Sequence, residues 1–408
     1  MTPAPSLDLV RLRQYRLARV RAEMSRLGIA ACIVSDPVNI RYATDTRNMQ
    51  IFTARNAPSR YLLLTEEHSI LYEFPGCMHL ARGFDTLTDI RPAMTASFVA
   101  AGEHIGEREI SWAREMADTI RGLVGLNACV GMERMNAGAT LALAAEGFRI
   151  VDAQRAIEMA RAIKSADEIE CVRTSLRVTE KAMAYMETYI RPGITENELW
   201  SHMHQKVITG GGDYCETRLL SSGPRTNPWF QETSARPIGA NELIAFDTDV
   251  VGCYGYYSDY SRTFHSGPDE PSAQQRTLYR IALEQVEHNV GILKPGLSFR
   301  EYSERAWDIP EQYRANRYYL SAHGCGMTGE YPYLYHHADF ADAGYEGELR
   351  PGMTICVESY IGEEGGSEGV KLEQQCLVTE RGVTLLSAFP FNARLLGSTR
   401  RPVMPELV

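Results

Sequence analysis

The stretch 244–264 constrains the fold and the chemistry of this chain more than any other part of the sequence. Apolar residues lead into Asp247, and Asp249 and Asp259 lie among β-forming tyrosines. Side chains two residues apart leave the same face of a strand, so a strand here predicts that Asp247 and Asp249 point the same way. If the chain turns back at 251–254, Asp259 returns beside them.

Three carboxylates that close repel one another strongly where the dielectric is low, so we expect cations between them. Further ligands occur downstream, where an imidazole lies in a Gly-rich turn and two glutamates lie on strand-like runs. Oxygen ligands with one imidazole suit two divalent ions such as Fe, Mn, Zn or Co, which can polarise a carbonyl or activate water. The predicted metal ligands are Asp247, Asp249, Asp259, His323, Glu358 and Glu373.

The order of these ligands resembles that of the pita-bread metallopeptidases, which include methionine aminopeptidases, prolidases and creatinase. The matching motifs lie at 259–264, 323–326, 351–358 and 371–373. The resemblance implies an α/β creatinase-like N-terminal domain and an α+β pita-bread C-terminal domain that holds the two metal ions. It also implies a homodimer and a small-molecule substrate.

Other segments resemble one branch of that family, the dimethylsulfoniopropionate (DMSP) lyases. They lie at 36–45, 48–50, 216–232 and 246–249, and the doubled aspartate of the last is itself a feature of the branch. The resemblance covers nearly the whole chain. It implies cleavage of DMSP, a small zwitterion, to dimethylsulfide and acrylate.

Two departures leave a second hypothesis open. Peptidases of the family carry a histidine where this chain has Glu330, and another in the run 227–231, which has none here. The lyase branch places an Asp base where this chain has Gly329, which has no side chain. The alternative to the lyase is therefore a metallohydrolase of the prolidase or aminopeptidase type, acting on a small amide or an Xaa-Pro dipeptide. An intact ligand set argues against a non-catalytic binding module, because buried carboxylates without metals are costly.

The candidates for proton transfer follow from these departures. With Gly329 at the usual base position, Tyr318 or Glu330 would take the proton in a lyase. In a hydrolase, Glu358 would be the shuttle base.

The candidates for substrate binding follow from the charge of an onium head group, which aromatic ring faces attract. The resemblance relates Tyr318 and Phe52 to substrate-contacting aromatic residues, and Trp229 is the third ring that we favour. Arg218 could clamp a carboxylate through two hydrogen bonds, or it could pair with Glu216 or Glu232.

The chain length of 408 residues suggests two domains, which we place at 1–162 and 163–408. Strands and helices alternate in the first, as in α/β proteins. In the second, we expect long helices at 166–189, 274–293 and 298–314, and a capping box, Thr195-x-x-Glu198, opens a further helix.

The composition excludes some partners. A net charge of −10 without a basic block disfavours nucleic acid, and no apolar run approaches the 18 residues of a membrane span. The N-terminal residues do not resemble a signal peptide, and nine scattered cysteines fit a reducing cytoplasm.

Overall fold

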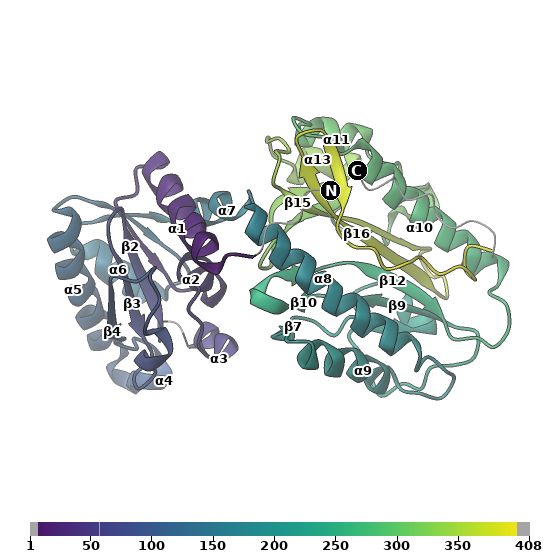
Figure 1. Ribbon diagram of the computed structural model, residues 1–408, viewed down its shortest axis with the longest axis horizontal. Coiled ribbons are helices and arrows are strands. Elements are labelled where there is room, and N and C mark those ends of the chain that lie inside the picture. Colours follow the sequence, from purple (N-terminus) through teal and green to yellow (C-terminus); the bar gives the residue numbers. More distant parts are fainter. Residues whose placement is uncertain (1–6, 57, 398–408) are drawn as a thin grey trace. The chain divides into compact units, whose positions relative to one another are not determined.

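Six strands form one sheet in the first unit of the computed structural model (Figure 1), which describes residues 7–56 and 58–397. The chain divides into two units, 1–161 and 162–408. The sheet order is β4-β3-β2-β1-β5-β6, and β1 pairs antiparallel with β2 and parallel with β5. The strands are β1 (Ala31–Val34), β2 (Tyr61–Thr65), β3 (Ser69–Glu73), β4 (Asp89–Pro92), β5 (Cys129–Met132) and β6 (Arg149–Asp152).

Helices accompany this sheet and confirm the α/β prediction for the N-terminal part of the chain. Helix α5 buries Trp112, whose ring meets that of Tyr61 edge to face at 5.9 Å. The unit also has a helix that the sequence did not predict, α2, which Asp36 caps and Pro37 opens. The helices are α1 (Leu9–Arg26), α2 (Pro37–Thr44), α3 (Gln50–Arg55), α4 (Phe98–Ala101), α5 (Ile105–Val124), α6 (Ala137–Ala145) and α7 (Gln154–Arg161).

The helices of the second unit follow the predicted pattern except at 298–314 and at 337–343, where no helix was predicted. The capping box of Thr195 and Glu198 is formed, and it opens α9. The helix expected at 298–314 is instead two short helices, because Pro310 has no N–H for a continuous helix and its ring clashes with the preceding turn. The helices are α8 (Ala166–Glu187), α9 (Glu196–Thr209), α10 (Ala273–Ile292), α11 (Phe299–Arg305), α12 (Glu311–Arg314) and α13 (His337–Ala343).

The largest sheet of the second unit has five strands in the order β14-β13-β15-β16-β17. One face of β15 and β16 is apolar and packs on α10 (Figure 1), with Val357 and Leu372 in the same buried cluster as Leu278 and Val286. Since consecutive residues of a strand alternate in direction, the polar residues between them face away from α10. The strands are β13 (Ala322–Cys325), β14 (Gly329–Leu334), β15 (Thr354–Gly362), β16 (Gly369–Thr379) and β17 (Gly382–Leu385).

Two smaller sheets, β12-β9-β8 and β11-β10-β7, complete the second unit. Side chains of β12 bond to the backbone of β16: Thr263 donates to the Lys371 carbonyl at 2.8 Å, and Arg262 donates to the Glu373 carbonyl at 2.7 Å. These bonds hold β12 beside the polar face of β16. The strands are β7 (Tyr214–Cys215), β8 (Leu220–Ser222), β9 (Leu243–Asp247), β10 (Val250–Val251), β11 (Tyr257–Ser258) and β12 (Ser261–His265).

None of the helices within 7–56 and 58–397 combines the length and the apolarity that crossing a membrane requires.

Candidate metal centre

The register of three strands places one imidazole and two carboxylates on the polar face of the five-stranded sheet. His323 of β13 pairs with Cys356 of β15, which pairs with Gln375 of β16. Two residues further along, Glu358 of β15 pairs with Glu373 of β16. Paired residues share a face and so do residues two apart, so His323, Glu358 and Glu373 are neighbours. Strand pairing alone therefore gathers three of the six predicted ligands.

The aspartates converge by a different route from the one predicted. Strand β9 ends at Asp247, and Asp249 has a φ of 40°, so the two do not lie on one continuous strand. The prediction that a pleated strand aligns them is wrong, because the chain kinks at Asp249 and passes from one small sheet into the other. Even so, ligand atoms of Asp247, Asp249 and Asp259 lie within 4.8 Å of one another. The left-handed conformation is rare outside glycine, and such conformations concentrate at functional sites.

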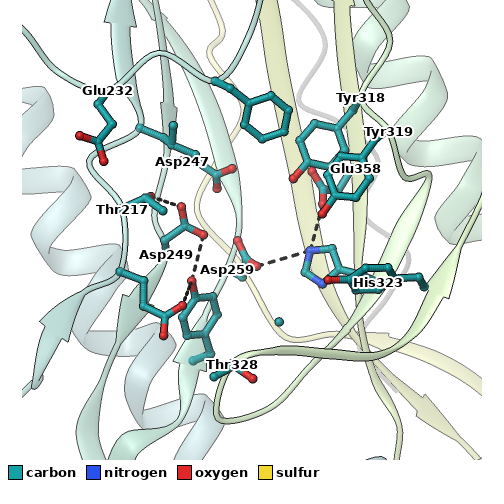
Figure 2. Close-up of a pocket in the computed structure, with 16 residues that line it drawn as sticks. Thr217, Glu232, Asp247, Asp249, Asp259, Tyr318, Tyr319, His323, Thr328 and Glu358 are labelled. Atoms are coloured by element: carbon teal, nitrogen blue, oxygen red, sulfur yellow. Dashed lines mark hydrogen bonds and ion pairs between the residues drawn. The ribbon is translucent and has the colours of Figure 1, made fainter. Parts of the chain in front are cut away.

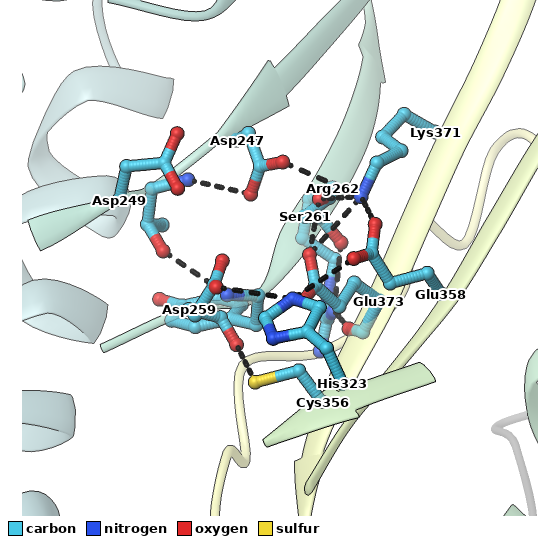
Figure 3. Close-up of polar contacts among 12 residues, drawn as sticks. Asp247, Asp249, Asp259, Ser261, Arg262, His323, Cys356, Glu358, Lys371 and Glu373 are labelled. Atoms are coloured by element: carbon cyan, nitrogen blue, oxygen red, sulfur yellow. Dashed lines mark hydrogen bonds and ion pairs between the residues drawn. The ribbon is translucent and has the colours of Figure 1, made fainter. Parts of the chain in front are cut away.

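His323 connects the two halves of the centre (Figure 3). Its Nε2 lies 2.9 Å from Oε1 of Glu358, 3.5 Å from Oδ2 of Asp259 and 3.8 Å from Oε1 of Glu373. Its Nδ1 lies 2.8 Å from the carbonyl oxygen of Gly324, which can only accept a hydrogen bond. In the neutral ring Nδ1 therefore carries the hydrogen, and Nε2 keeps the lone pair that a metal ligand needs.

Burial makes the carboxylates of this centre difficult to ionise together. Burial, with the charge of Asp247, raises the pKa of Asp249 to about 7, and burial, with Glu358, raises the pKa of Glu373 to about 8. Burial also raises the pKa of Asp259 well above its ordinary value. Burial opposes ionisation of Glu358 as well, but Lys371 and His323 outweigh it and lower the pKa of Glu358. The carboxylates of the centre outnumber its positively charged side chains, so added cations would stabilise their ionised forms.

Two buried oxygen atoms test whether metal ions fit this arrangement. When His323 is neutral, with its hydrogen on Nδ1, no described residue donates a hydrogen bond to Oε1 of Glu358 or to Oε1 of Glu373. Buried acceptors without donors are unfavourable and are natural ligands for a cation. A second set of ligand atoms within 4.8 Å of one another comes from Asp259, His323, Cys356 and Glu373. The residues present therefore fit divalent metal ions.

A cavity of about 350 Å³ opens onto the centre (Figure 2). Two carboxylates outside the predicted ligand set, Glu216 and Glu232, line it together with the ligands. The rings that line it are Phe230, Tyr257, Tyr318, Tyr319 and Tyr333. Three successive ring pairs run along one wall: Phe230 to Tyr318 at 5.2 Å, Tyr318 to Tyr319 at 4.9 Å, and Tyr319 to Tyr333 at 6.3 Å between centroids.

The structure distinguishes Trp229, the ring that the sequence analysis favoured, from its neighbour Phe230. Trp229 is buried with Leu219, Ala245 and Tyr360, and it does not line the cavity. Phe230, with a φ of 69° and 56 % exposure, does line it. The preference for Trp229 as the ring that contacts substrate is therefore wrong, since the left-handed residue turns Phe230 toward the cavity.

Of the other three residues predicted to contact substrate, only Tyr318 lines the cavity. Tyr318 lines the cavity, where burial and the charges of Glu358 and Asp247 raise its pKa. Arg218 does not line the cavity, and its half-exposed side chain pairs with Glu232 at 3.1 Å. This contact matches the ion-pair alternative rather than a clamp on substrate. Phe52 lies on α3 of the first unit, where its ring meets Phe74 edge to face at 5.6 Å.

Glu330 does not face the cavity. Its neighbour Gly329 lines the cavity, and consecutive strand residues point to opposite faces. The carboxylate of Glu330 is buried on the other face, in an ion pair with Lys164. The predicted role of Glu330 as a base therefore does not fit its position. Gly329 leaves space beside His323, because an added Cβ would lie 3.8 Å from the nearest imidazole carbon.

Tyr319, Tyr333 and Lys371 escaped the sequence analysis, which considered Glu216 only as a partner of Arg218. Lys371 lies two residues before Glu373, so the period of a strand was a usable indication that both share a face. No comparable pattern pointed to Tyr319 or Tyr333, which come from a loop and from β14.

Comparison with known proteins identifies relatives over nearly the whole chain. Residues 170–380 match metallopeptidase family M24, and residues 16–163 match the creatinase/prolidase N-terminal domain. The chain is 33 % identical to dimethylsulfoniopropionate lyase DddP of Roseovarius nubinhibens, covering 96 % of this chain and 89 % of the relative. It is 34 % identical to the lyase of the same name from Roseobacter denitrificans, covering 96 % and 88 %.

Solved structures show the same fold. The prolidase from Thermococcus sibiricus superposes with a TM-score of 0.77 at 20 % identity, covering 95 % of this chain and 99 % of that one. At that identity the likeness concerns the fold alone. The predicted fold class, a creatinase-like N-terminal domain followed by a pita-bread domain, is confirmed.

Proposed function

The chain belongs to metallopeptidase family M24, and from that premise we propose that it is a dinuclear-metal lyase that cleaves DMSP to dimethylsulfide and acrylate. The observation that carries the proposal is the composition of the cavity wall. Predicted metal ligands and a row of aromatic rings line the same cavity (Figure 2). A small carboxylate with an onium head group complements both groups, and two relatives that align over 96 % of this chain are DMSP lyases.

Two divalent ions, Fe, Mn, Zn or Co, are part of the proposal. Their ligands would be Asp247, Asp249, Asp259, His323, Glu358 and Glu373. When bound, such ions supply Lewis acidity that polarises the substrate carboxylate and acidifies the adjacent C–H.

The aromatic wall would hold the sulfonium head. A sulfonium has no N–H to donate, so hydrogen-bond acceptors alone recognise it poorly, whereas ring faces attract any cation. Phe230, Tyr319 and Tyr333 are between 37 % and 56 % exposed, although large apolar rings are normally covered. The carboxylates of Glu216 and Glu232 add negative potential to the same cavity.

Glu216 is the proton acceptor that we propose. It lines the cavity, it lies outside the predicted ligand set, and it accepts a hydrogen bond from the Tyr257 hydroxyl at 3.2 Å. Glu232, the other such carboxylate, pairs with Arg218 at 3.1 Å and supplies the matched variant for the test. Glu216 would take the proton from the carbon next to the substrate carboxylate as the C=C bond forms. The C–S bond breaks, and dimethylsulfide leaves with the bonding electron pair.

Tyr318 is better suited to donate a hydrogen bond than to act as a base. Burial and the neighbouring carboxylates raise its pKa, so the phenol keeps its proton at neutral pH. Its position on the cavity wall would let it orient the substrate carboxylate.

The proposal is tested with purified protein loaded with each candidate metal. Headspace detection of dimethylsulfide from DMSP is the expected result, and protein that loads metal but releases none would refute the lyase. Glu216→Gln should lower kcat by about 10²- to 10⁴-fold, whereas the matched variant Glu232→Gln should change mainly KM. Gly329→Asp in the Glu216→Gln background should restore part of the rate, because an added side chain has room there.

The second candidate function is a metallohydrolase of the prolidase type. The match to family M24 favours it, since the proposed metal centre can also activate water. Glu358 would then be the shuttle base. Release of proline from Xaa-Pro dipeptides, without dimethylsulfide from DMSP, would select this candidate.

The remaining parts of the proposal concern the assembly and the compartment. We propose a cytoplasmic homodimer that acts on a small molecule. All nine cysteines are free thiols, which fits a reducing compartment, and the dimer rests on the family resemblance. Light scattering of the purified protein tests the dimer, and cell fractionation tests the compartment.

A further inference from the structure

Lys371 lies among the proposed metal ligands and is fully buried (Figure 3). Its ammonium nitrogen Nζ lies 2.6 Å from Oε2 of Glu358, 3.1 Å from Oε2 of Glu373 and 3.3 Å from Oδ2 of Asp247. It also donates to the Ser261 hydroxyl at 2.8 Å, and that hydroxyl donates to Oε2 of Glu373 at 2.8 Å. One lysine thus contacts three carboxylates from two different sheets.

The carboxylates of Glu358 and Glu373 have the same orientation relative to Lys371. In both, Oε2 faces Lys371, and in both, Oε1 is buried and accepts no hydrogen bond from the described part of the chain while His323 is neutral. Oε1 of both glutamates lies within 4 Å of Nε2 of His323. The lysine therefore binds Oε2 of each glutamate, and Oε1 of each glutamate stays beside the imidazole of His323.

We propose that Lys371 is a resident cation of the metal centre, which holds Oε2 of Glu358 and of Glu373 and neutralises one carboxylate charge. The inference rests on the proposed metal pair but not on the substrate. Five carboxylates are involved, those of Asp247, Asp249, Asp259, Glu358 and Glu373. With the positive charge of Lys371, the set retains four negative charges, which two divalent ions balance. Charge balance matters here because an uncompensated charge is costly in a buried site.

Two aromatic rings hold the lysine in place. Nζ lies 4.8 Å from the centroid of Tyr318 and 5.9 Å from that of Trp229. Ring faces stabilise a cation without competing for its hydrogens, which remain available to the carboxylates. This contact gives buried Trp229 a role behind the lysine rather than in the cavity.

The test compares Lys371→Met with Lys371→Arg by thermal unfolding, each with a chelator and with Mn²⁺. Lys371→Met should lower the Tm of the metal-free protein by on the order of 10 °C, because three carboxylates lose their partner. Mn²⁺ should then raise the Tm of Lys371→Met by more than it raises that of the wild type, since the ions replace the missing charge. Lys371→Arg keeps the charge, so its Mn²⁺-induced rise should match the wild type even if packing lowers its Tm.

Lys164→Met is the matched control, because Lys164 is also buried but pairs with Glu330, away from the cavity. Its Mn²⁺-induced rise should equal that of the wild type. Equal rises in Lys371→Met and Lys164→Met would overturn the inference. Loss of a merely structural lysine would lower the Tm of the metal-free and the Mn²⁺-loaded protein by the same amount. If Lys371→Met folds only with Mn²⁺, the inference is supported; if Mn²⁺ stabilises only the wild type, it is overturned. Dimethylsulfide release is measured separately, so failure of the lyase proposal would not affect this comparison.

Discussion

Two buried glutamate sites, one in each unit, differ in how completely their charges are paired. In the first unit, Glu73 accepts hydrogen bonds from Arg60 at 2.9 Å, from Asn48 at 2.8 Å and from the backbone N–H of Phe74 at 2.8 Å. In the second unit, Glu358 and Glu373 share Lys371, and beside a neutral His323 each keeps one buried oxygen without a donor among the described residues.

The difference separates a structural carboxylate from a functional one. Glu73 has a donor for each oxygen, so nothing more needs to bind there. The carboxylates around Lys371 exceed the positive charges that the chain supplies, and folding alone leaves that excess. An unbalanced buried cluster next to a cavity is a place where a ligand completes the structure.

The largest effect should come from Asp259→Asn, which removes a charge from the unbalanced cluster while keeping the shape of the side chain. Activity and bound metal should both fall by at least about 10²-fold. Even mutation of a residue that only hydrogen-bonds to a metal ligand lowers metal affinity or activity by about 10- to 100-fold. Metal analysis and a dimethylsulfide assay check the result. Asp342→Asn on exposed α13 is the control and should change neither quantity. Full metal content in Asp259→Asn would remove this carboxylate from the centre.

Glu73→Gln should destabilise the first unit by about 3–5 kcal/mol, because it leaves the buried guanidinium of Arg60 without its counter-charge. Hydrogen exchange of β2 and β3 measures the loss. Asp89→Asn breaks the exposed pair with Arg91 in the same sheet and should cost no more than about 1 kcal/mol. Equal losses in the two variants would show that the buried pairing contributes nothing special.

Metal removal should affect only the unbalanced cluster. A ligand present at 100 times its Kd stabilises a protein by about 2.7 kcal/mol, so chelation should lower the stability of the second unit by about that amount. Hydrogen exchange should rise in β15 and β16 and stay unchanged in β2 and β3. A uniform rise in both units would contradict the contrast drawn here.

The smallest effect concerns Glu133, a buried glutamate of the first unit that accepts hydrogen bonds from Asn39 and from the backbone N–H of Asp36. Burial, with the charge of Asp36, raises the pKa of Glu133 to about 7. The unfolded chain ionises this carboxyl first, so its contribution to stability is present below about pH 4.5 and is lost as the pH rises through 7.

Glu133→Gln cannot ionise, so between pH 5 and pH 8 its stability should fall by about 1–3 kcal/mol less than that of the wild type. Urea unfolding at the two pH values, followed by hydrogen exchange of β5, checks the difference. Parallel pH profiles would show that Glu133 ionises as easily in the folded protein as in the unfolded one.

Much of the fold follows from local patterns in the sequence. The capping residues Thr195 and Glu198 locate the start of α9, and the helix expected at 274–293 is α10, which begins and ends one residue earlier. Patterns of this kind involve neighbours along the chain. They failed at Pro310, where one residue interrupts a favourable helical run, and at α2, which Asp36 caps and for which no helix was predicted.

The site was harder to predict where its geometry depends on neighbouring strands. Residue types and their order were enough to propose Asp259, His323, Glu358 and Glu373, whose ligand atoms the structure brings close together. The backbone at Asp249 could not be predicted, because its left-handed conformation arises where the chain passes between two sheets. The direction of Glu330 could not be predicted either, since its partner Lys164 is far away in the sequence.

The ionisable and aromatic groups of this protein, and the local elements that carry them, follow from the order of its amino acids. Three aspartates in one stretch, followed by one imidazole and two glutamates on strand-like runs, indicated a metal centre. Tertiary structure decided which oxygen of each glutamate Lys371 occupies and which ring, Phe230 or Trp229, meets the cavity. The reason is physical: charge and residue type belong to the chain, whereas pairing and direction depend on strands that only folding brings together.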